Sequence, residues 1–288
     1  MEQNTSKTAT IIYSPNQRGK LGWIQTWIIL VRNIISSKDL IMQLFKRDFL
    51  MAYKRSFLGM GWLIITPIMG IVSWVFYNAT GILTPGDVGI PYPAYVLLSS
   101  SIFGLWGSFQ SAAAGTLTAG AGFINQVNYP HDALLAKQVL LQLANFLISF
   151  LLNILVLLFF GVTPSWMIVL FPILILPLFF LGSAIGLIIA LVSVVAPDVN
   201  RGINFLIGLV MYVTPVIYSP NVSNPTLRII IKYNPLTYLI GGCRDAIIYG
   251  HIAHFGYYLL FSFCTLVLFL VSWRFFYVSE QKIIEKMI

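Results

Sequence analysis

The segment KRDFLMAYKRSFLGMGW (residues 46–62) sets four basic side chains directly in front of a long apolar run. These are Lys46, Arg47, Lys54 and Arg55. Positive clusters beside apolar stretches mark the cytoplasmic side of membrane proteins. The segment therefore predicts a membrane-spanning helix that starts at the inner surface of a bilayer.

The composition of the whole chain agrees with this interpretation. Of its 288 residues, 58% are hydrophobic and only 9% are charged, with a mean hydropathy of +0.85. A soluble domain carries about 25% charged residues, so this chain cannot cover a surface that faces water. The net charge of +8 would also suit nucleic acid, but the basic residues gather beside apolar stretches, which indicates membrane topology and anionic lipid. The predicted fold class is an all-α integral membrane protein with six transmembrane helices, amphipathic interfacial helices at the N-terminus, and re-entrant outer helices within residues 220–254 before the last span.

Six segments are long and apolar enough to span a bilayer, which takes about 20 residues each. They are residues 58–78, 93–113, 134–160, 166–194, 203–219 and 255–276. With six spans, both termini lie on one side, and residues 79–92, 161–165 and 220–254 lie on the other. That far side holds only Arg228, Lys232 and Arg244 of the 17 Lys and Arg residues. The positive-inside rule therefore predicts cytoplasmic termini.

Two further helices are predicted before the first span. Residues 21–35 are too short to cross a bilayer and too apolar for water, which indicates a helix in the membrane interface with Trp23 and Trp27 at headgroup level. Residues 38–56 are predicted to form a second amphipathic helix in the plane of the inner leaflet, although Asp48 and Arg55 fall off its polar arc. Its charges either only set the topology or also receive an anionic, lipid-linked substrate.

Four stretches of the chain resemble motifs of one membrane-protein family, in order and in spacing. They are RDFLMAYKRSFLGMGWLIITPIM (47–69), FINQVNYPHDALLAK (123–137), APDVNRGINFLIGLVMYVTPVIYSP (196–220) and YNPLTYLIGGCRDAIIYG (233–250). Together they resemble the ABC-2-type permeases that export polysaccharides. The resemblance covers the chain from about residue 38 and divides it into an N-terminal arm (1–56) and a six-helix transmembrane domain (57–288). One departure is Gly241, where relatives often carry an acid; here Asp245 follows Arg244 instead.

The resemblance implies a homodimer that works with two copies of a separate cytoplasmic ABC ATPase. Such exporters move a lipid-linked polysaccharide across the bacterial inner membrane; O-antigen is the first expectation, and capsule or teichoic acid the alternatives. The chain has no GxxxxGK[ST] phosphate loop, so we expect it to be no enzyme. No cofactor is expected in this chain, and ATP and Mg²⁺ belong to the partner ATPase.

The resemblance and the residues together predict four groups of functional side chains. The entry site for the substrate headgroup comprises Lys46, Arg47, Tyr53, Lys54 and Arg55. The channel lining comprises Trp74, Tyr77, Phe103, Trp106, Phe109 and Tyr212, whose rings would stack on sugars and let them slide. The ATPase contact comprises Phe123, Ile124, Val127, Tyr129, Pro130, His131, Asp198 and Arg201. The outer cap over the exit comprises Arg244 and Asp245.

The channel residues also have a plainer interpretation, because aromatic residues commonly anchor spans at the interface or fill helix packing. The plainer interpretation of the ATPase contact is an ordinary interfacial turn. Three other classes of protein fit the sequence less well. An ion-coupled carrier usually places an ionisable residue within a span, and none lies centrally here. A membrane enzyme acting on polyprenyl-linked glycans would need clustered carboxylates, which are scattered in this sequence. A scaffold would not need the motifs. No metal site is expected, since His251 and His254 have no third ligand nearby.

Overall fold

The computed structural model describes residues 18–54, 57–119 and 131–284, and the regular elements in these ranges are all helical. Two short 3₁₀ turns, η1 (Arg18–Lys20) and η2 (Gly59–Gly61), occur near the start. The helices of the first half are α1 (Trp23–Ser36), α2 (Lys38–Lys54), α3 (Trp62–Ala79), α4 (Tyr92–Ala114), α5 (Thr116–Ala119) and α7 (His131–Phe159). The second half holds η3 (Trp166–Leu170), α8 (Phe171–Leu174), α9 (Leu176–Val195), α10 (Pro197–Val213), α11 (Pro225–Tyr233), α12 (Pro235–Tyr249) and α13 (Phe255–Ile284).

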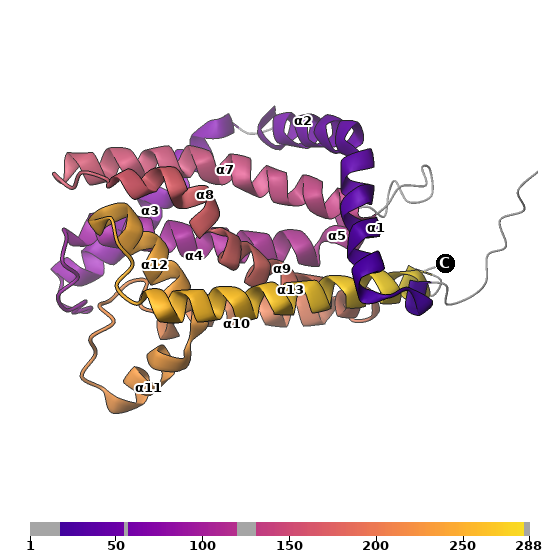
Figure 1. The fold of residues 1–288 in the computed structure, drawn as a ribbon. Coiled ribbons are helices and arrows are strands. Elements are labelled where there is room, and N and C mark those ends of the chain that lie inside the picture. Colours follow the sequence, from indigo (N-terminus) through magenta and orange to yellow (C-terminus); the bar gives the residue numbers. More distant parts are fainter. Residues whose placement is uncertain (1–17, 55–56, 120–130, 285–288) are drawn as a thin grey trace, which may run out of the picture.

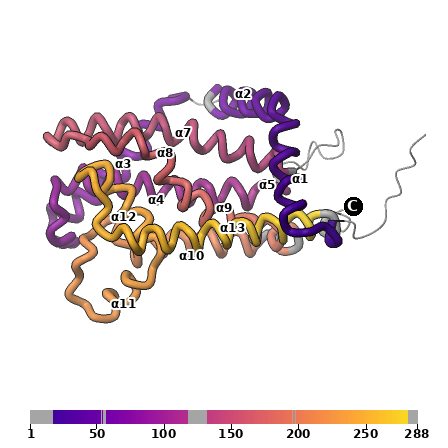
Figure 2. The backbone as a smooth tube through the Cα atoms, viewed as in Figure 1, coloured from indigo at the N-terminus to yellow at the C-terminus, as the bar shows by residue number. Residues whose placement is uncertain are grey.

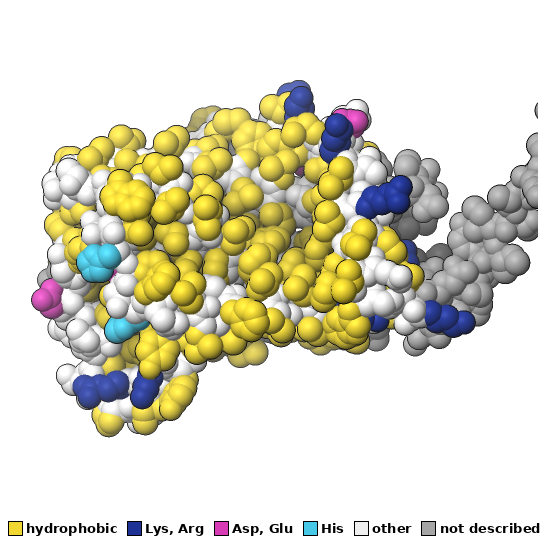
Figure 3. All heavy atoms as spheres, in the orientation of Figure 1, with side chains coloured by type: hydrophobic (Ala, Val, Ile, Leu, Met, Phe, Trp, Pro, Cys, Tyr) yellow, Lys and Arg dark blue, Asp and Glu magenta, His cyan; other side chains and the backbone are white. Residues whose placement is uncertain are grey.

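The long helices α7, α4, α9 and α13 lie side by side, and α1 crosses one end of this bundle (Figures 1 and 2). We call that end, where α7 begins and α13 finishes, the α1 end. The opposite end holds α12, the start of α13 and the α3–α4 connection, and we call it the α12 end. Hydrophobic side chains cover most of the visible face between the two ends, while Lys and Arg gather at the α1 end and around α11 (Figure 3).

Four helical stretches in the described part of the chain are long and apolar enough to cross a membrane. They are Gly59–Ala79, Asp132–Phe159, Trp166–Val194 and Phe255–Glu280. Their bounds agree with four of the predicted spans within a few residues. The other two predicted spans correspond to α4 and α10, which are helical but less apolar or shorter.

Helix α4 is the centre of the bundle and packs against α3, α7 and α9. Its close contact with α9 depends on two glycines of α9 that are four residues apart, Gly182 and Gly186. A Cβ at Gly182 would lie 2.7 Å from the carbonyl oxygen of Trp106, and one at Gly186 would meet the carbonyl oxygen of Gln110. Small residues with this spacing allow helices to approach closely in membranes, where water does not drive association.

The predicted span 203–219 is wrong at its end, where residues 214–219 are not helical, and its helix begins six residues before the predicted start. Helix α10 begins at Pro197, which suits the first turn of a helix because its missing N–H would have no partner there. It ends at Val213, and Thr214 is extended with φ −112° and ψ 134°. The cause is Pro215, whose ring disfavours helical backbone at the preceding residue. The apolar residues 214–219 therefore form a non-helical segment at the α12 end.

The predicted helices of the N-terminal arm are confirmed as helices. Helix α1 exposes an apolar stripe, Trp23, Ile24, Ile28, Val31 and Ile35, while its Leu30 is fully buried. Helix α2 packs on the first half of α7 (Figure 1).

Candidate functional site

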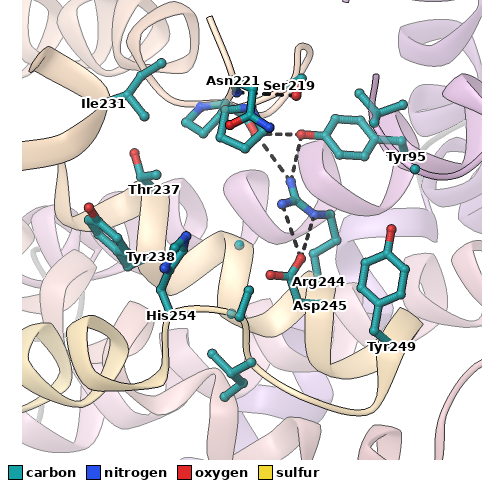
Figure 4. Close-up of a pocket in the computed structure, with 18 of the residues that line it drawn as sticks. Tyr95, Ser219, Asn221, Ile231, Thr237, Tyr238, Arg244, Asp245, Tyr249 and His254 are labelled. Carbon is teal, nitrogen blue, oxygen red and sulfur yellow. Dashed lines mark hydrogen bonds and ion pairs between the residues drawn. The ribbon is translucent and has the colours of Figure 1, made fainter. Parts of the chain in front are cut away.

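Arg244 of α12 is a buried cation that joins three segments at the α12 end. Arg244 is only 8% exposed to solvent. Nη1 donates to the hydroxyl of Tyr95 at 2.8 Å and to the carbonyl of Pro215 at 3.4 Å, and Nη2 lies 3.3 Å from Oδ1 of Asp245 (Figure 4). The guanidinium also stands 4.6 Å from the centre of the Tyr95 ring. A buried charge needs such partners, because leaving it unpaired costs several kcal/mol.

Tyr95 extends this contact from α4 to the non-helical segment 214–219. Its hydroxyl donates to the carbonyl oxygens of Pro215 and Tyr218, at 3.1 and 2.9 Å. Tyr92, one turn earlier in α4, donates to the carbonyl oxygen of Ile217 at 3.0 Å. The backbone that α10 leaves without helical partners is thus satisfied by tyrosine side chains, which fixes its path.

A pocket of about 520 Å³ opens beside Arg244 (Figure 4). It lies between the 85–91 loop, segment 214–221, α11, α12 and residues 252–254 of the connection to α13. Tyr238 forms part of its wall and donates to the carbonyl oxygen of Lys232 at 3.0 Å. Burial, and then the neighbouring Tyr257, raise the pKa of Tyr238, so its hydroxyl stays protonated. The two outer-cap residues of the sequence prediction, Arg244 and Asp245, therefore lie together and line this pocket.

The six predicted channel residues divide into two groups. Trp74, Tyr77 and Tyr212 form one cluster across α3 and α10, with ring centres 5.8 Å apart for Trp74–Tyr77 and 6.4 Å for Trp74–Tyr212. Tyr77 and Tyr212 are 39% and 55% exposed, so this cluster is open to the surroundings of the protomer. Phe103, Trp106 and Phe109 are instead 8%, 3% and 1% exposed and lie in the core of the bundle.

The predicted entry residues are only partly described. Lys46, Arg47 and Lys54 are exposed on α2, whereas Arg55 and the side chain of Tyr53 lie outside the described residues. Asp48 accepts hydrogen bonds from Nζ of Lys137 on α7 at 2.7 Å and from Nε of Arg47 at 2.8 Å. Burial raises the pKa of Asp48, but the hydrogen bonds and charges of Lys137 and Arg47 outweigh it, so the pKa lies below its usual value.

Most of the predicted ATPase contact lies outside the described residues. This holds for Phe123, Ile124, Val127, Tyr129 and Pro130, while His131 is the first residue of α7. Asp198 and Arg201 are exposed on the first turn of α10, and their charged atoms are 3.4 Å apart. Asp198 also suits the N-terminus of a helix, where the aligned peptide dipoles favour a negative charge.

Asp132 is a functional candidate that the sequence did not reveal. It is 2% exposed and accepts hydrogen bonds from Nδ2 of Asn33 on α1 and Nε1 of Trp273 on α13, both at 3.2 Å. It thereby joins three helices directly after residues 120–130. An acid at the start of an apolar stretch was the available signal, but its partners lie 99 and 141 residues away.

A second set of contacts at the α1 end ties the start of the described chain, η1 and α1, to α13. Arg18 lies 3.4 Å from a carboxylate oxygen of Glu280, and its guanidinium stands 4.4 Å from the centre of the Tyr277 ring. Arg274 of α13 stands 4.1 Å from the centre of the Trp23 ring and donates to the carbonyl of Leu21. The described start of the N-terminal arm, residues 18–36, is therefore an integral part of the bundle.

These observations define an integral membrane protein whose charged sites lie at the two ends of an apolar helical bundle. The family model of the ABC-2 type transporter matches residues 39–248, and the chain belongs to this family.

Curated relatives match most of the chain. An O-antigen export system permease protein RfbA of Myxococcus xanthus is 25% identical over 226 residues, which are 78% of this chain and 85% of the relative. A protein of the same name from Klebsiella pneumoniae is 25% identical over 247 residues, 81% of this chain and 89% of the relative. The polysialic acid transport protein KpsM of Escherichia coli is 22% identical over 250 residues, 82% and 93% of the two chains.

Proposed function

We propose that this chain is the permease subunit of an ATP-driven exporter that moves a lipid-linked polysaccharide across the bacterial inner membrane. The observation that carries the proposal is the match to relatives named as O-antigen export permeases, which covers 78% and 81% of the chain. O-antigen is therefore the first substrate class to test. The match to a polysialic acid transport protein makes an acidic capsule polymer the second.

The proposed topology has six spans with the α1 end in the cytoplasm. At about 1.5 Å per residue, the 23 residues of α4 extend about 35 Å and the 17 residues of α10 about 26 Å, close to the roughly 30 Å of a bilayer core. Adding α4 and α10 to the four apolar stretches puts both chain ends on one side. The excess of Lys and Arg at that side makes it the cytoplasmic one, and α11 and α12 then re-enter from the outer side.

The proposed substrate path lies along α3 and α10, where two copies of the chain meet. Helix α3 has no buried residue, and α10 exposes Phe205, Leu206, Leu209 and Tyr212. Because Trp74, Tyr77 and Tyr212 cluster on this open surface, we retain them as the lining and assign Phe103, Trp106 and Phe109 to packing within the protomer. Rings offer apolar faces to sugars without fixing them in place.

The proposed motor is a cytoplasmic ATPase that binds at the α1 end, with ATP and Mg²⁺ in that partner. Exposed Asp198 and Arg201 and the segment before α7 would form the contact. The test is to purify the permease alone and with its ATPase partner, and to measure phosphate release. We expect turnover only in the complex; ATP hydrolysis by the permease alone would contradict the proposal.

The substrate class is tested by expressing the permease and its ATPase in two bacterial strains, one lacking its O-antigen permease and one lacking its capsule permease. Restored O-antigen ladders on lipopolysaccharide gels support the first choice, and restored capsule staining supports the second. Failure in both strains, with the complex present in the membrane, would contradict export of these polymers.

A further inference from the structure

The pocket beside Arg244 lies at the α12 end and is separate in position from the aromatic cluster of α3 and α10. Its lining combines rings, hydroxyls and charges at the end of the bundle away from the proposed ATPase (Figure 4). A volume of about 520 Å³ leaves room for a sugar residue together with water.

One polar atom in this lining has no partner. The hydroxyl oxygen of Thr237 is buried and makes no hydrogen bond within the described residues. Thr237 lines the pocket between Ile231 and Tyr238 (Figure 4). Burying an unpaired hydroxyl costs free energy, and a rotation of the Thr237 side chain toward a ligand hydroxyl in the pocket would remove that cost.

The charge that remains available in the lining is positive. Asp245 already pairs with Arg244, and Asp87 accepts a hydrogen bond from the backbone N–H of Gly89 at 2.9 Å. Arg228 and Lys232 are exposed, lie four residues apart on α11, and make no ion pair with any described residue. Arg228 uses Nε and Nη2 to donate to the carbonyl oxygen of Val222, which leaves its Nη1 for a ligand, and Nζ of Lys232 lies 5.9 Å from the centre of the Tyr233 ring. Their side chains therefore offer a pair of cations to an incoming anion.

Rigid rings form the remaining wall. The ring of Tyr238 stacks on Tyr257 and Phe261 of α13, with centres 4.9 and 5.3 Å apart. Tyr249 lines the pocket from the other end of α12. Rings held in this way provide flat apolar surfaces, which suit the C–H faces of a pyranose.

We propose that this pocket binds a sugar residue that carries a carboxylate. The two cations of α11 bind the carboxylate, the rings contact the sugar, and Thr237 bonds one of its hydroxyls. The biological meaning rests on the proposed function, because the ligand would then be an acidic residue of the exported polymer. Binding itself needs neither the ATPase nor transport, so it is tested separately from export.

Gly241 provides a way to close the pocket. It lies on the part of α12 that lines the cavity, and a Cβ there would meet no described atom closer than Nη2 of Arg244, at 3.7 Å. The leucine side chain of the variant Gly241→Leu therefore fills the pocket without a clash that would displace α12. Gly256→Leu on α13 is the matched control, because a Cβ at Gly256 has no described atom within 4 Å and Gly256 does not line the pocket.

The experiment measures binding of glucuronic acid and of glucose, which differ only in the carboxylate, to the permease in phosphatidylcholine nanodiscs by saturation-transfer NMR. We expect glucuronic acid to bind about tenfold more tightly, since bonds between charged groups are the stronger ones. Arg228→Gln with Lys232→Gln should remove that preference, and Gly241→Leu should abolish binding of both sugars. The control Gly256→Leu should bind as the wild type does.

Three results would overturn the proposal. The first is equal binding of the two sugars, and the second is unchanged binding by Gly241→Leu with its melting temperature intact. The third is full competition by inorganic phosphate at the concentration of the sugar, which would show a simple anion site. Loss of export with sugar binding retained would contradict the proposed function and leave this site standing.

Discussion

The carboxylate of Asp48 on α2 accepts a hydrogen bond from Nζ of Lys137 on α7 at 2.7 Å, and Lys137 is only 4% exposed. Helix α2 is thereby held on the bundle by a charge pair as well as by apolar contact. Asp48→Asn leaves the buried ammonium without this carboxylate, which should cost about 3 kcal/mol. We expect Asp48→Asn to lower the melting temperature in detergent more than the double change Asp48→Asn with Lys137→Met. Equal melting of the single variant and the wild type would contradict this role.

The same pair sets a dependence on pH. Because Lys137 and Arg47 hold the pKa of Asp48 below its ordinary value, the stabilisation is complete above the unfolded pKa of about 3.9 and is lost as the pH falls through the folded one. The difference in melting temperature between wild type and the double variant should be constant from about pH 8 to 5 and shrink below about pH 4. If the difference in melting temperature already shrinks at pH 6, its pH dependence arises from a group other than Asp48.

The close contact of α4 with α9 predicts that adding one methyl group at Gly186 lowers the free energy of unfolding. A Cβ there would meet the carbonyl of Gln110 and the side chain of Ala113, so Gly186→Ala should cost about 1–3 kcal/mol by overpacking. Gly208→Ala on α10 is the control, because no described atom lies within 4 Å of its Cβ. Thermal unfolding followed by size-exclusion fluorescence measures both variants, and equal melting would contradict the packing argument.

Tyr95 should hold segment 214–219 in place through its hydroxyl. Tyr95→Phe removes the one hydroxyl proton that the carbonyls of Pro215 and Tyr218 share, and the acceptor of the bond from Arg244, each worth about 1 kcal/mol. We expect faster tryptic cleavage at Arg228 and Lys232, which follow this segment. Tyr212→Phe should be cleaved like the wild type, because Tyr212 contacts the segment through its backbone carbonyl, which accepts from the hydroxyl of Tyr218 and is kept in the variant.

The exposed aromatic cluster predicts a loss of export when its largest ring is removed. Trp74→Ala should reduce surface polysaccharide about fivefold if each ring contact is worth about 1 kcal/mol. Trp166→Ala is the matched control, because Trp166 is 69% exposed and lies outside the cluster. Equal export by the two variants, at equal membrane levels, would remove Trp74 from the substrate path.

The basic residues before the first span are predicted to receive the substrate headgroup. Lys54→Glu with Arg55→Glu should block export while assembly with the ATPase persists, because two negative charges would repel an anionic headgroup. Export and co-purification are measured on the same membranes. Wild-type export by this variant would leave these charges as topology signals.

Several parts of the fold follow from local sequence alone. The stretches around α3, α7 and α13 are long and strongly apolar, so their helices were predicted within a few residues. The boundary of α10 was missed because residues 214–219 continue the apolar run, while the effect of Pro215 on Thr214 outweighs it. Hydrophobicity reports burial in lipid or protein and does not report backbone conformation.

The candidate site was harder to predict, because its contacts join distant parts of the chain. Asp48 did not fit the amphipathic pattern of its own helix, and the reason is Lys137, 89 residues further along. Phe103, Trp106 and Phe109 are aromatic, as residues of a channel wall would be, yet they fill the centre of one protomer. A single sequence does not distinguish aromatic side chains that pack a core from those that face a passage.

Asp132 gives the α1 end a mechanical property. Because its two carboxylate oxygens are bonded to Asn33 and Trp273, α7 cannot turn at its first residues without pulling on the N-terminal arm and on the last helix. A force applied to the chain just before His131 would therefore be transmitted to both α1 and α13. A conformational change of a partner ATPase at this point would thus displace the helix at the membrane surface, α1, together with the last helix, α13.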